Sequence, residues 1–476
     1  MAGFAAIVLI IVCGGHAGPV AGTWPLSRWF GLLNVPSAGW SDRSGARLLL
    51  IAVTVLALAW LVIHRAARAR RLSLSAVAGV AAGWSVPLLV APPLFSGDLY
   101  SYTAQGLLQW QGMDPYRVGP SALGPTSALS AVDPRWQDVP APYGPLALLV
   151  ERAAAAVSGG GAVATLVTLR LIMQLALLGC AVVAVRAVAV GERPAVLSYV
   201  LLSPLIVLQV SSAGHLESLL MLGILGAVVA AQRQCWTVAI AAATAAFAIK
   251  ASVLPAVVAI CWFHATQVSV HRERLRVVRS DLIIALATYG VVALIVPDNW
   301  GWVRSLSTPG QSVTADAPTT IVVRLLTDLP GAIALRTDPT ILTVGRILGM
   351  LLAAAIGCGL IVTHRSRPLA ATVGYALLAV GLLGPVLYPW YLLWGIAPLI
   401  LRAGRHHRML TLMMCMGPLL EIPGLTGVRN TALGFGAAAI LVLAERLTSF
   451  PPSREFADPR MGNGPAQMEY YRTVVV

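Results

Sequence analysis

Long apolar runs, broken by short arginine clusters and polar loops, recur along almost the whole of this 476-residue chain. Only 11% of its residues are charged, whereas soluble domains carry roughly 25%. A soluble fold with so few charges could not cover its surface, so the bilayer must be the solvent for most of the chain. The runs do not alternate in polarity as barrel strands do. We therefore predict an all-α polytopic membrane protein.

About fourteen of the apolar runs are long enough, or nearly long enough, to span a bilayer as helices. They lie near residues 2–20, 48–63, 74–90, 162–185, 195–210, 216–231, 236–249, 251–268, 282–296, 341–362, 369–387, 391–401, 409–420 and 431–443. We assign residues 1–447 to one transmembrane domain. Residues 448–476 are rich in proline and polar side chains and are predicted to form a disordered tail.

Basic side chains predict the orientation of these spans. Arginine clusters at residues 65–71, 272–279, 365–367 and 402–408 fall on one side when the spans alternate. The positive-inside rule makes this side cytoplasmic, and both termini then lie there. The polar loops 96–142 and 297–339 face the outside. Alternation also requires that residues 143–157 do not span, and the central Glu151 and Arg152 favour a helix lying on the outer face of the membrane instead.

The formal net charge of +14 is spread over clusters of this kind instead of forming one basic patch, so we predict no nucleic-acid partner. The six cysteines lie far apart, in or beside apolar runs and without a CxxC pair. We interpret them as packing residues and not as disulfides or metal ligands.

Asp98 is the most informative acidic residue of the first outer loop. It directly follows a predicted span and begins a run in which Tyr100, Thr103 and Leu107 share one helical face. Ser96 could cap this helix, and the helix dipole favours a carboxylate in the first turn. On local sequence alone, a helix-start residue is therefore the simpler interpretation of Asp98, and a catalytic carboxylate is the alternative.

His215, Glu217 and Lys250 form a second group of candidates. His215 and Glu217 stand at the outer start of a predicted span, and Lys250 stands at the outer tip of the next hairpin, on the same side of the membrane. His215 and Glu217 either hold a substrate hydroxyl or ring or simply face water. Lys250 requires an anionic partner, a carboxylate or a phosphate, unless it is a snorkelling anchor.

Two arginines and an aromatic cluster complete the candidates on the outer side. Arg170 and Arg346 lie within the outer portions of two spans, where arginine is costly and usually pairs with an acid or lines a cavity. Phosphate is one ligand that a guanidinium binds in bidentate fashion. Trp390 and Tyr391 mark an outer interface, either as part of an aromatic belt or as a stacking surface for a sugar or a prenyl chain.

These residues lie in motifs that resemble the polyprenol-phosphomannose-dependent α-1,6-mannosyltransferases of actinobacteria, which are GT-C membrane glycosyltransferases of lipomannan and lipoarabinomannan synthesis. The matching motifs are Gly97-Asp98-Leu99-Tyr100-Ser101-Tyr102, Gln105-Gly106, Asp114-Pro115-Tyr116, Gly119-Pro120, Ala141-Pro142-Tyr143-Gly144-Pro145 and Pro389-Trp390-Tyr391. His215 and Glu217 are similar to the family's Gly-x-His-Asn-acid element, and Lys250 to its hairpin lysine. Leu216 departs from the usual asparagine.

The resemblance implies a GT-C fold in the bacterial cytoplasmic (inner) membrane, with residues 1–447 as the catalytic domain and the loops 96–142 and 297–339 over an active site facing outward. It implies a polyprenyl-phosphate-mannose donor, a mannosylated phosphatidylinositol or lipomannan acceptor, and surrounding membrane lipids. Asp98 would be the catalytic base of an inverting single displacement.

The resemblance also implies roles for the other candidates. The donor phosphate would be bound by Arg170, Lys250 and Arg346, so that neither a metal nor a cofactor is required. The expected substrate-binding residues are Tyr100, Tyr102, Asp114, Tyr116, Tyr143, His215, Glu217, Trp390 and Tyr391.

Two alternatives remain at this stage. A decaprenyl-phosphoarabinose-dependent arabinosyltransferase would share the architecture and the first-loop acid. A lipid or sugar transporter would instead place its charged residues near the membrane midplane, in broken helices and paired halves. Here the charged candidates gather at one face, which favours a transferase.

Overall fold

The computed structural model describes residues 1–17, 42–296, 300–305, 317–327 and 339–420. Within these ranges the chain is all-helical and has no strand, which confirms the predicted fold class at that level. The α-helices are α1 (Ala2–Ala17), α2 (Asp42–Arg68), α3 (Leu74–Val90), α4 (Asp98–Trp110), α5 (Ser127–Ala131), α6 (Pro145–Val157), α7 (Ala162–Arg186), α8 (Arg193–Leu202), α9 (Pro204–Ile206), α10 (Glu217–Gln232), α11 (Trp236–Phe247), α12 (Leu254–Ala265), α13 (His271–Ile295), α14 (Gly301–Arg304), α15 (Pro318–Thr327), α16 (Pro339–Val362), α17 (Leu369–Leu383), α18 (Leu392–Ile400) and α19 (Ala403–Met416). A π-helical turn, Val207–Ser212, continues α9.

The apolar helices make this a membrane protein. Among the described residues, five segments are long and apolar enough to cross a bilayer: Ser44–Arg68, Ala162–Arg186, Val190–Ser212, His271–Ile295 and Thr340–Val362. Seven other predicted spans coincide with apolar helices of only 10–17 residues, and a rise of about 1.5 Å per residue makes them shorter than a bilayer core of about 30 Å. The span predicted at 409–420 overlaps α19, which is not among these apolar helices. The span predicted at 431–443 and the tail 448–476 lie outside the described residues.

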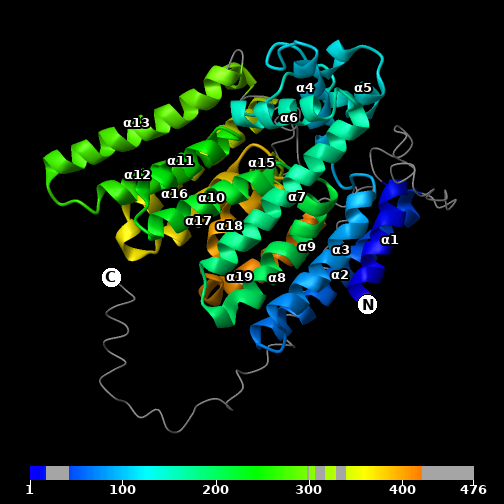
Figure 1. Ribbon diagram of the computed structural model, residues 1–476, viewed down its shortest axis with the longest axis horizontal. Coiled ribbons are helices and arrows are strands. Elements are labelled where there is room, and N and C mark those ends of the chain that lie inside the picture. Colours follow the sequence, from blue (N-terminus) through cyan, green and yellow to red (C-terminus); the bar gives the residue numbers. More distant parts are fainter. Residues whose placement is uncertain (18–41, 297–299, 306–316, 328–338, 421–476) are drawn as a thin grey trace, which may run out of the picture.

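Burial separates central helices from peripheral ones. Within Val190–Ser212, 94% of the 18-residue apolar stretch is buried inside the protein, whereas the corresponding shares are 17% in α13 and 28% in α16. Leu286 and Leu294 of α13 are largely exposed, and this helix runs along the edge of the bundle (Figure 1). Exposed leucines on a spanning helix fit lipid as the surrounding solvent.

A small helical cap lies at one end of the bundle. Helices α4, α5 and α6 group beyond one end of α7, while the loop joining α2 to α3 lies at the other end (Figure 1). Helix α6 packs on α4 and α7, and its 13 residues are too few to cross a bilayer. The prediction of a non-spanning helix in this segment is therefore consistent with the structure.

The two charged residues of α6, whose charges were the basis of that prediction, have different environments. Arg152 is exposed, but Glu151 is fully buried against α4, where Gly106 allows the backbones of the two helices to approach closely. Burial without a charged partner among the described residues raises the pKa of Glu151 well above its ordinary value. A neutral carboxyl group resolves the conflict between charge and burial.

Candidate active site

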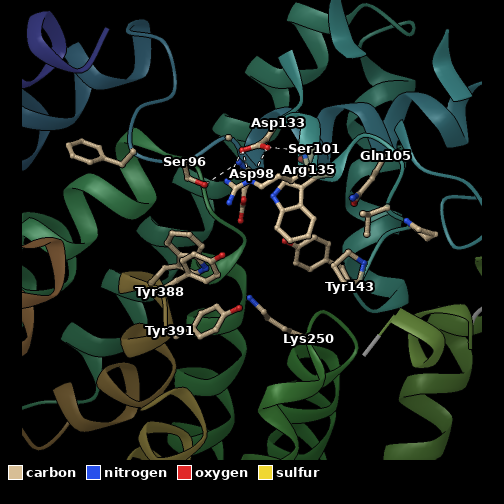
Figure 2. Close-up of a pocket in the computed structure, with 17 residues that line it drawn as sticks. Ser96, Asp98, Ser101, Gln105, Asp133, Arg135, Tyr143, Lys250, Tyr388 and Tyr391 are labelled. Carbon is tan, nitrogen blue, oxygen red and sulfur yellow. Dashed lines mark hydrogen bonds and ion pairs between the residues drawn. The ribbon is translucent and has the colours of Figure 1, made fainter. Parts of the chain in front are cut away.

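A pocket opens between the cap and the adjoining ends of the bundle helices. Its wall comes from some of the residues between 95 and 105 around the start of α4, from some of those between 133 and 143 in the loop between α5 and α6, and from Lys250, Tyr388, Trp390 and Tyr391. Tyr100, Tyr102 and Asp138 lie within these stretches but do not line the pocket. About 1000 Å³ within it is free of protein atoms, open solvent included. In Figure 2, Asp98, Asp133 and Arg135 lie on one side, and Lys250 and Tyr391 lie on the other.

Asp98 begins α4, as the sequence predicts, and its carboxylate points into this pocket. The hydroxyl of Ser96 accepts a hydrogen bond from the Asp98 backbone N–H at 3.1 Å. One turn later, Tyr102 donates its phenolic hydrogen to Asp98 Oδ2 at 3.3 Å. His215 Nδ1 lies 3.4 Å from the same oxygen. The Asp98 side chain remains 25% exposed, so it is both held in place and accessible.

The environment keeps the Asp98 carboxylate ionised. Burial alone would raise its pKa, but the contact with His215, the charge of Lys250 and the hydroxyl of Ser96 together lower the pKa below its ordinary value. Asp98 can therefore accept a proton, and it cannot act as a proton donor near neutral pH.

His215 owes its position to the turn that follows the π-helix. Gly214 has a φ of +75°, and a Cβ at this position would meet the Leu99 side chain at 3.0 Å. Glycine is therefore required both by the left-handed backbone and by the close approach of α4. The His215 ring stacks on Trp390 with centroids 3.9 Å apart, and Trp390 stacks on Tyr388 at 4.6 Å. The ring is fixed between Trp390 and the carboxylate of Asp98.

Lys250 is paired with Glu217. This contact confirms the prediction that the two residues lie at the same end of their helices. Lys250 Nζ donates to Glu217 Oε1 at 2.9 Å, and Trp394 Nε1 donates to the same oxygen at 3.3 Å. The ammonium group also lies 4.7 Å from the ring centroid of Tyr391. Glu217 is only 1% exposed and does not line the pocket, whereas Lys250 does. The pair therefore presents its cationic member to the pocket.

Two further predicted residues, Tyr102 and Tyr143, contact one another beside Asp98. Their rings meet edge to face with centroids 5.2 Å apart. Burial, followed by the neighbouring negative charges, raises the pKa of both phenols well above the ordinary value. They remain neutral hydrogen-bond donors, and Tyr143 contributes part of the pocket wall.

Four further predicted site residues do not line the pocket. Asp114 accepts a hydrogen bond from the Tyr116 N–H at 2.9 Å and pairs with Arg117. Tyr116 donates to the Tyr143 carbonyl at 2.9 Å and so supports the wall from behind. Tyr100 is 1% exposed within an apolar cluster. Arg346 is 8% exposed on α16 and is absent from the pocket wall that the described residues form.

Arg170 also lies outside that wall, and its surroundings explain why it is buried. Its guanidinium donates to the carbonyls of Leu88 and Ala91 at the end of α3, and to the Ser212 carbonyl at 2.9 Å. Residue 91 precedes the segment carrying Asp98, and residue 212 precedes the turn carrying His215. Arg170 thus joins the two segments, and backbone carbonyls occupy its two terminal nitrogens, Nη1 and Nη2, which we expected to bind phosphate.

We expect Arg170→Gln to destabilise the protein strongly, because it leaves several buried carbonyls without a charged donor. The expected loss is about 3–5 kcal/mol, as for breaking a buried charged interaction. Thermal unfolding of the purified protein in detergent measures it, with Arg186→Gln at the exposed end of the same helix as the control. Equal unfolding midpoints for the two variants would show that the Arg170 contacts add no stability.

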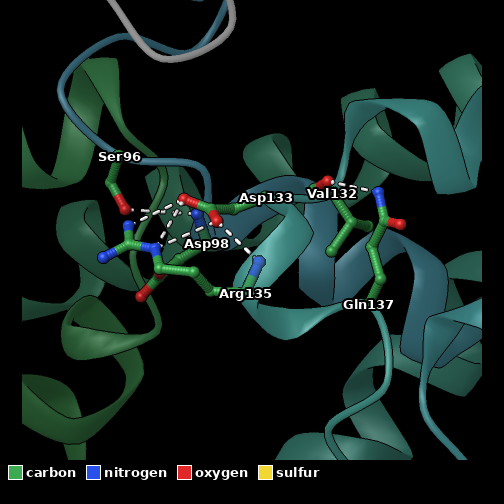
Figure 3. Close-up of polar contacts among 6 residues, drawn as sticks. All are labelled: Ser96, Asp98, Val132, Asp133, Arg135 and Gln137. Carbon is green, nitrogen blue, oxygen red and sulfur yellow. Dashed lines mark hydrogen bonds and ion pairs between the residues drawn. The ribbon is translucent and has the colours of Figure 1, made fainter. Parts of the chain in front are cut away.

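The sequence analysis missed one charged pair in the pocket, Asp133 and Arg135. Both lie in the loop between α5 and α6, and Arg135 Nη2 pairs with Asp133 Oδ2 at 2.7 Å (Figure 3). The hydrogen bonds from Arg135 lower the pKa of Asp133, so this carboxylate is also ionised. No apolar periodicity or motif marked this loop, and only its folding over α4 brings the pair to Asp98.

The pocket brings together an ionised carboxylate, a lysine and stacked aromatic rings, and the family profiles that match the chain identify this membrane protein as a glycosyltransferase. The profile of the family described as "Alpha-(1->6)-mannopyranosyltransferase, N-terminal domain" matches residues 1–266, and that described as "MptB C-terminal domain" matches residues 313–443. The chain belongs to the alpha-(1->6)-mannopyranosyltransferase family, which confirms the resemblance seen in the sequence.

Individual relatives extend the match over most of the chain. Alpha-(1->6)-mannopyranosyltransferase A of Mycobacterium tuberculosis is 31% identical over 409 residues, covering 83% of this chain and 78% of that protein. A probable alpha-(1->6)-mannopyranosyltransferase of Mycolicibacterium smegmatis is 30% identical over 423 residues, covering 79% and 73%. Alpha-(1->6)-mannopyranosyltransferase B of Corynebacterium glutamicum is 27% identical over 400 residues, covering 76% and 66%. No solved structure shows a significant match.

Proposed function

We propose that this chain transfers mannose from polyprenyl-phosphate-mannose to a lipid-linked mannan acceptor, forming an α-(1→6) linkage by inverting single displacement. The observation that carries the proposal is the ionised carboxylate of Asp98, partly exposed in a pocket that Lys250 enters from the other side. The names of the relatives support mannose as the transferred sugar. The acceptor would be a mannosylated phosphatidylinositol or lipomannan.

The proposed reaction requires one base and one cation. Asp98 removes the proton from the acceptor hydroxyl while that oxygen attacks C1 of the mannose. The bond between C1 and the phosphate oxygen breaks, and polyprenyl phosphate leaves with the negative charge. A β-linked donor then gives an α-linked product. The pocket offers the Asp98 carboxylate to remove the proton and the Lys250 ammonium group to stabilise the leaving phosphate.

We assign the phosphate to Lys250 and no longer to Arg170 or Arg346. Lys250 lines the pocket, and its side chain is 17% exposed. Arg170 is occupied by carbonyls of two backbone segments. A lysine fixed in place before the reaction stabilises charge that develops on the leaving group.

The surrounding architecture forms part of the same proposal. Residues 1–447 would form a GT-C domain of about fourteen spans, with the loops 96–142 and 297–339 over the site. The site would face outward from a bacterial cytoplasmic membrane, with both termini and the tail 448–476 inside. The short apolar helices would then cross the bilayer together with their flanking residues.

Donor competition tests the proposed sugar. The purified full chain in lipid nanodiscs is given labelled polyprenyl-phosphate-mannose, labelled polyprenyl-phosphate-arabinose, or both, with a mannosylated phosphatidylinositol acceptor. We expect label to transfer from the mannose donor and an excess of the arabinose donor to compete weakly. Transfer from the arabinose donor alone would make the chain an arabinosyltransferase.

We expect the pH dependence of transfer to report the ionisation of Asp98. The base works only as a carboxylate, so activity is present above its lowered pKa and is lost as the pH falls through that value. His215→Gln removes the contact that most strongly lowers this pKa, so the acid limb of the kcat profile moves to higher pH. Profiles of both proteins at saturating substrate measure the shift. A limb that stays in place or moves to lower pH would contradict this role of His215.

A further inference from the structure

The pocket contains an ion pair that the proposed chemistry does not use. Arg135 Nε donates to Asp133 Oδ1 at 3.1 Å, and Arg135 Nη2 donates to Asp133 Oδ2 at 2.7 Å. The Arg135 backbone N–H donates to Asp133 Oδ1 at 2.9 Å. The Arg135 side chain is nevertheless 71% exposed. Three hydrogen bonds orient the pair, and it stands at the rim beside Asp98 and Ser96 (Figure 3).

A buried amide faces the pocket on the same wall. Gln105 is only 4% exposed, it lines the pocket, and its Oε1 has no hydrogen-bond partner among the described residues. Figure 2 shows its amide nitrogen directed into the pocket. This nitrogen can donate a hydrogen bond to a ligand in the pocket. Ser101 and Trp136 lie on the same wall and add a hydroxyl group and an aromatic face.

We propose that Asp133, Arg135, Gln105 and Trp136 form a binding subsite for a neutral sugar ring of the acceptor. This inference rests on the proposed function, which it deepens by placing the acceptor. A sugar hydroxyl donates to the Asp133 carboxylate, and the exposed N–H groups of Arg135 donate to neighbouring hydroxyls. The Gln105 amide bonds a further hydroxyl, and Trp136 covers the apolar face of the ring.

Charge separates this subsite from the donor end of the pocket. Asp98, Asp133 and Arg135 together carry a net negative charge, and both carboxylates line the pocket. A phosphate group at this end would meet two carboxylates and only one cation, which disfavours it. At the other end, the carboxylate partner of Lys250 is turned away from the pocket. Uncharged hydroxyl groups therefore fit the Asp133 end, and the donor phosphate fits the Lys250 end.

Asp98 lies at the Asp133 end of the pocket, where a base for the acceptor hydroxyl is needed. The exposed rim at Arg135 leaves room for the rest of a long saccharide to extend into solvent. The donor, in contrast, must keep its prenyl chain against the apolar helices, and Lys250 lies where α11 and α12 meet. The arrangement accommodates a donor from the lipid side and an acceptor chain from the water side.

The experiment measures kinetics and equilibrium binding with a neutral alkyl dimannoside as the acceptor, which carries no phosphate. The proteins are the full chain in nanodiscs with Asp133→Asn or Arg135→Gln. The Arg117→Gln control, between α4 and α5, and the Asp138→Asn control, between α5 and α6, change the same residue types outside the pocket wall. Arg117 is an especially close match because its side chain is also 71% exposed and pairs with an aspartate. An exposed ion pair adds little stability, so these variants should fold.

We expect Asp133→Asn and Arg135→Gln to raise the KM for the dimannoside about ten- to a hundredfold, as loss of a charged hydrogen bond predicts. The KM for polyprenyl-phosphate-mannose should stay unchanged, and both controls should behave as wild type. Saturation-transfer NMR measures the binding of the dimannoside in the absence of donor. This binding should weaken in the two variants by about as much as their acceptor KM rises. A rise in the donor KM instead, or an unchanged acceptor KM, would overturn the subsite.

The binding measurement separates this inference from the proposed function. If wild type transfers no sugar but binds the dimannoside, and the two variants lose that binding, the subsite stands and the proposed reaction fails. If wild type transfers mannose while the variants bind the dimannoside as well as wild type does, the reaction stands and the subsite is wrong. A wild type that neither binds nor transfers would overturn both.

Discussion

An Asp98→Asn protein is expected to transfer sugar about 10²–10⁴ times more slowly than wild type, as loss of a general base predicts. Asparagine keeps the size of the side chain and an oxygen that can accept the Tyr102 hydrogen bond. It cannot remove a proton from the acceptor hydroxyl. The loss should therefore appear in kcat, while donor binding and the folded state are preserved.

Single-turnover transfer from labelled polyprenyl-phosphate-mannose measures this loss, and equilibrium binding of the donor checks the fold of the variant. Asp138→Asn is the matched control, because it removes an exposed carboxylate of the loop between α5 and α6 that does not line the pocket. The control should keep the wild-type rate. Near-normal turnover of Asp98→Asn would exclude Asp98 as the base.

Lys250→Met is expected to reduce both stability and turnover. It leaves the carboxylate of Glu217 buried without its cation, at a cost of about 3–5 kcal/mol. It also removes the charge proposed to stabilise the leaving phosphate, which should lower kcat by about 10²–10³-fold. Thermal unfolding and transfer kinetics measure the two effects separately.

A double variant distinguishes the two roles of Lys250. In Lys250→Met/Glu217→Gln both charges are absent, so no unpaired carboxylate remains, and the Trp394 indole can still donate to the glutamine oxygen. We expect the double variant to recover most of the stability but little of the turnover. Full recovery of turnover would mean that Lys250 only neutralises Glu217.

The main features of the fold could be predicted because bilayer physics acts on local sequence. Apolar runs marked the spanning helices, and the start of α4 at Asp98 followed from a polar segment after a span. Hairpin connectivity placed Lys250 on the same side as Glu217, because two consecutive spans return the chain to the side where it started, and the two residues do form an ion pair. Such features depend on residues close in sequence, so they can be predicted from the sequence of one chain.

Contacts between distant segments could not be predicted in the same way. Arg170 appeared suited to phosphate, but carbonyls of two segments about 80 and 40 residues away in sequence bind it. Nothing in the sequence indicated that α4 would bury Glu151 completely. Asp133 and Arg135 reach the pocket only because their loop folds over α4. Each outcome depends on packing that hydropathy does not encode.

The anomeric configuration of the product tests the central claim most directly. Purified wild type in nanodiscs is incubated with β-linked polyprenyl-phosphate-mannose, carrying ¹³C at C1, and the alkyl dimannoside, and the product is examined by NMR. Transfer through one displacement with Asp98 as base predicts a single new mannose, α-linked to the 6-hydroxyl of the acceptor. A β-linked product would contradict the inverting mechanism, and an unmodified acceptor with intact donor would contradict mannosyl transfer by this chain.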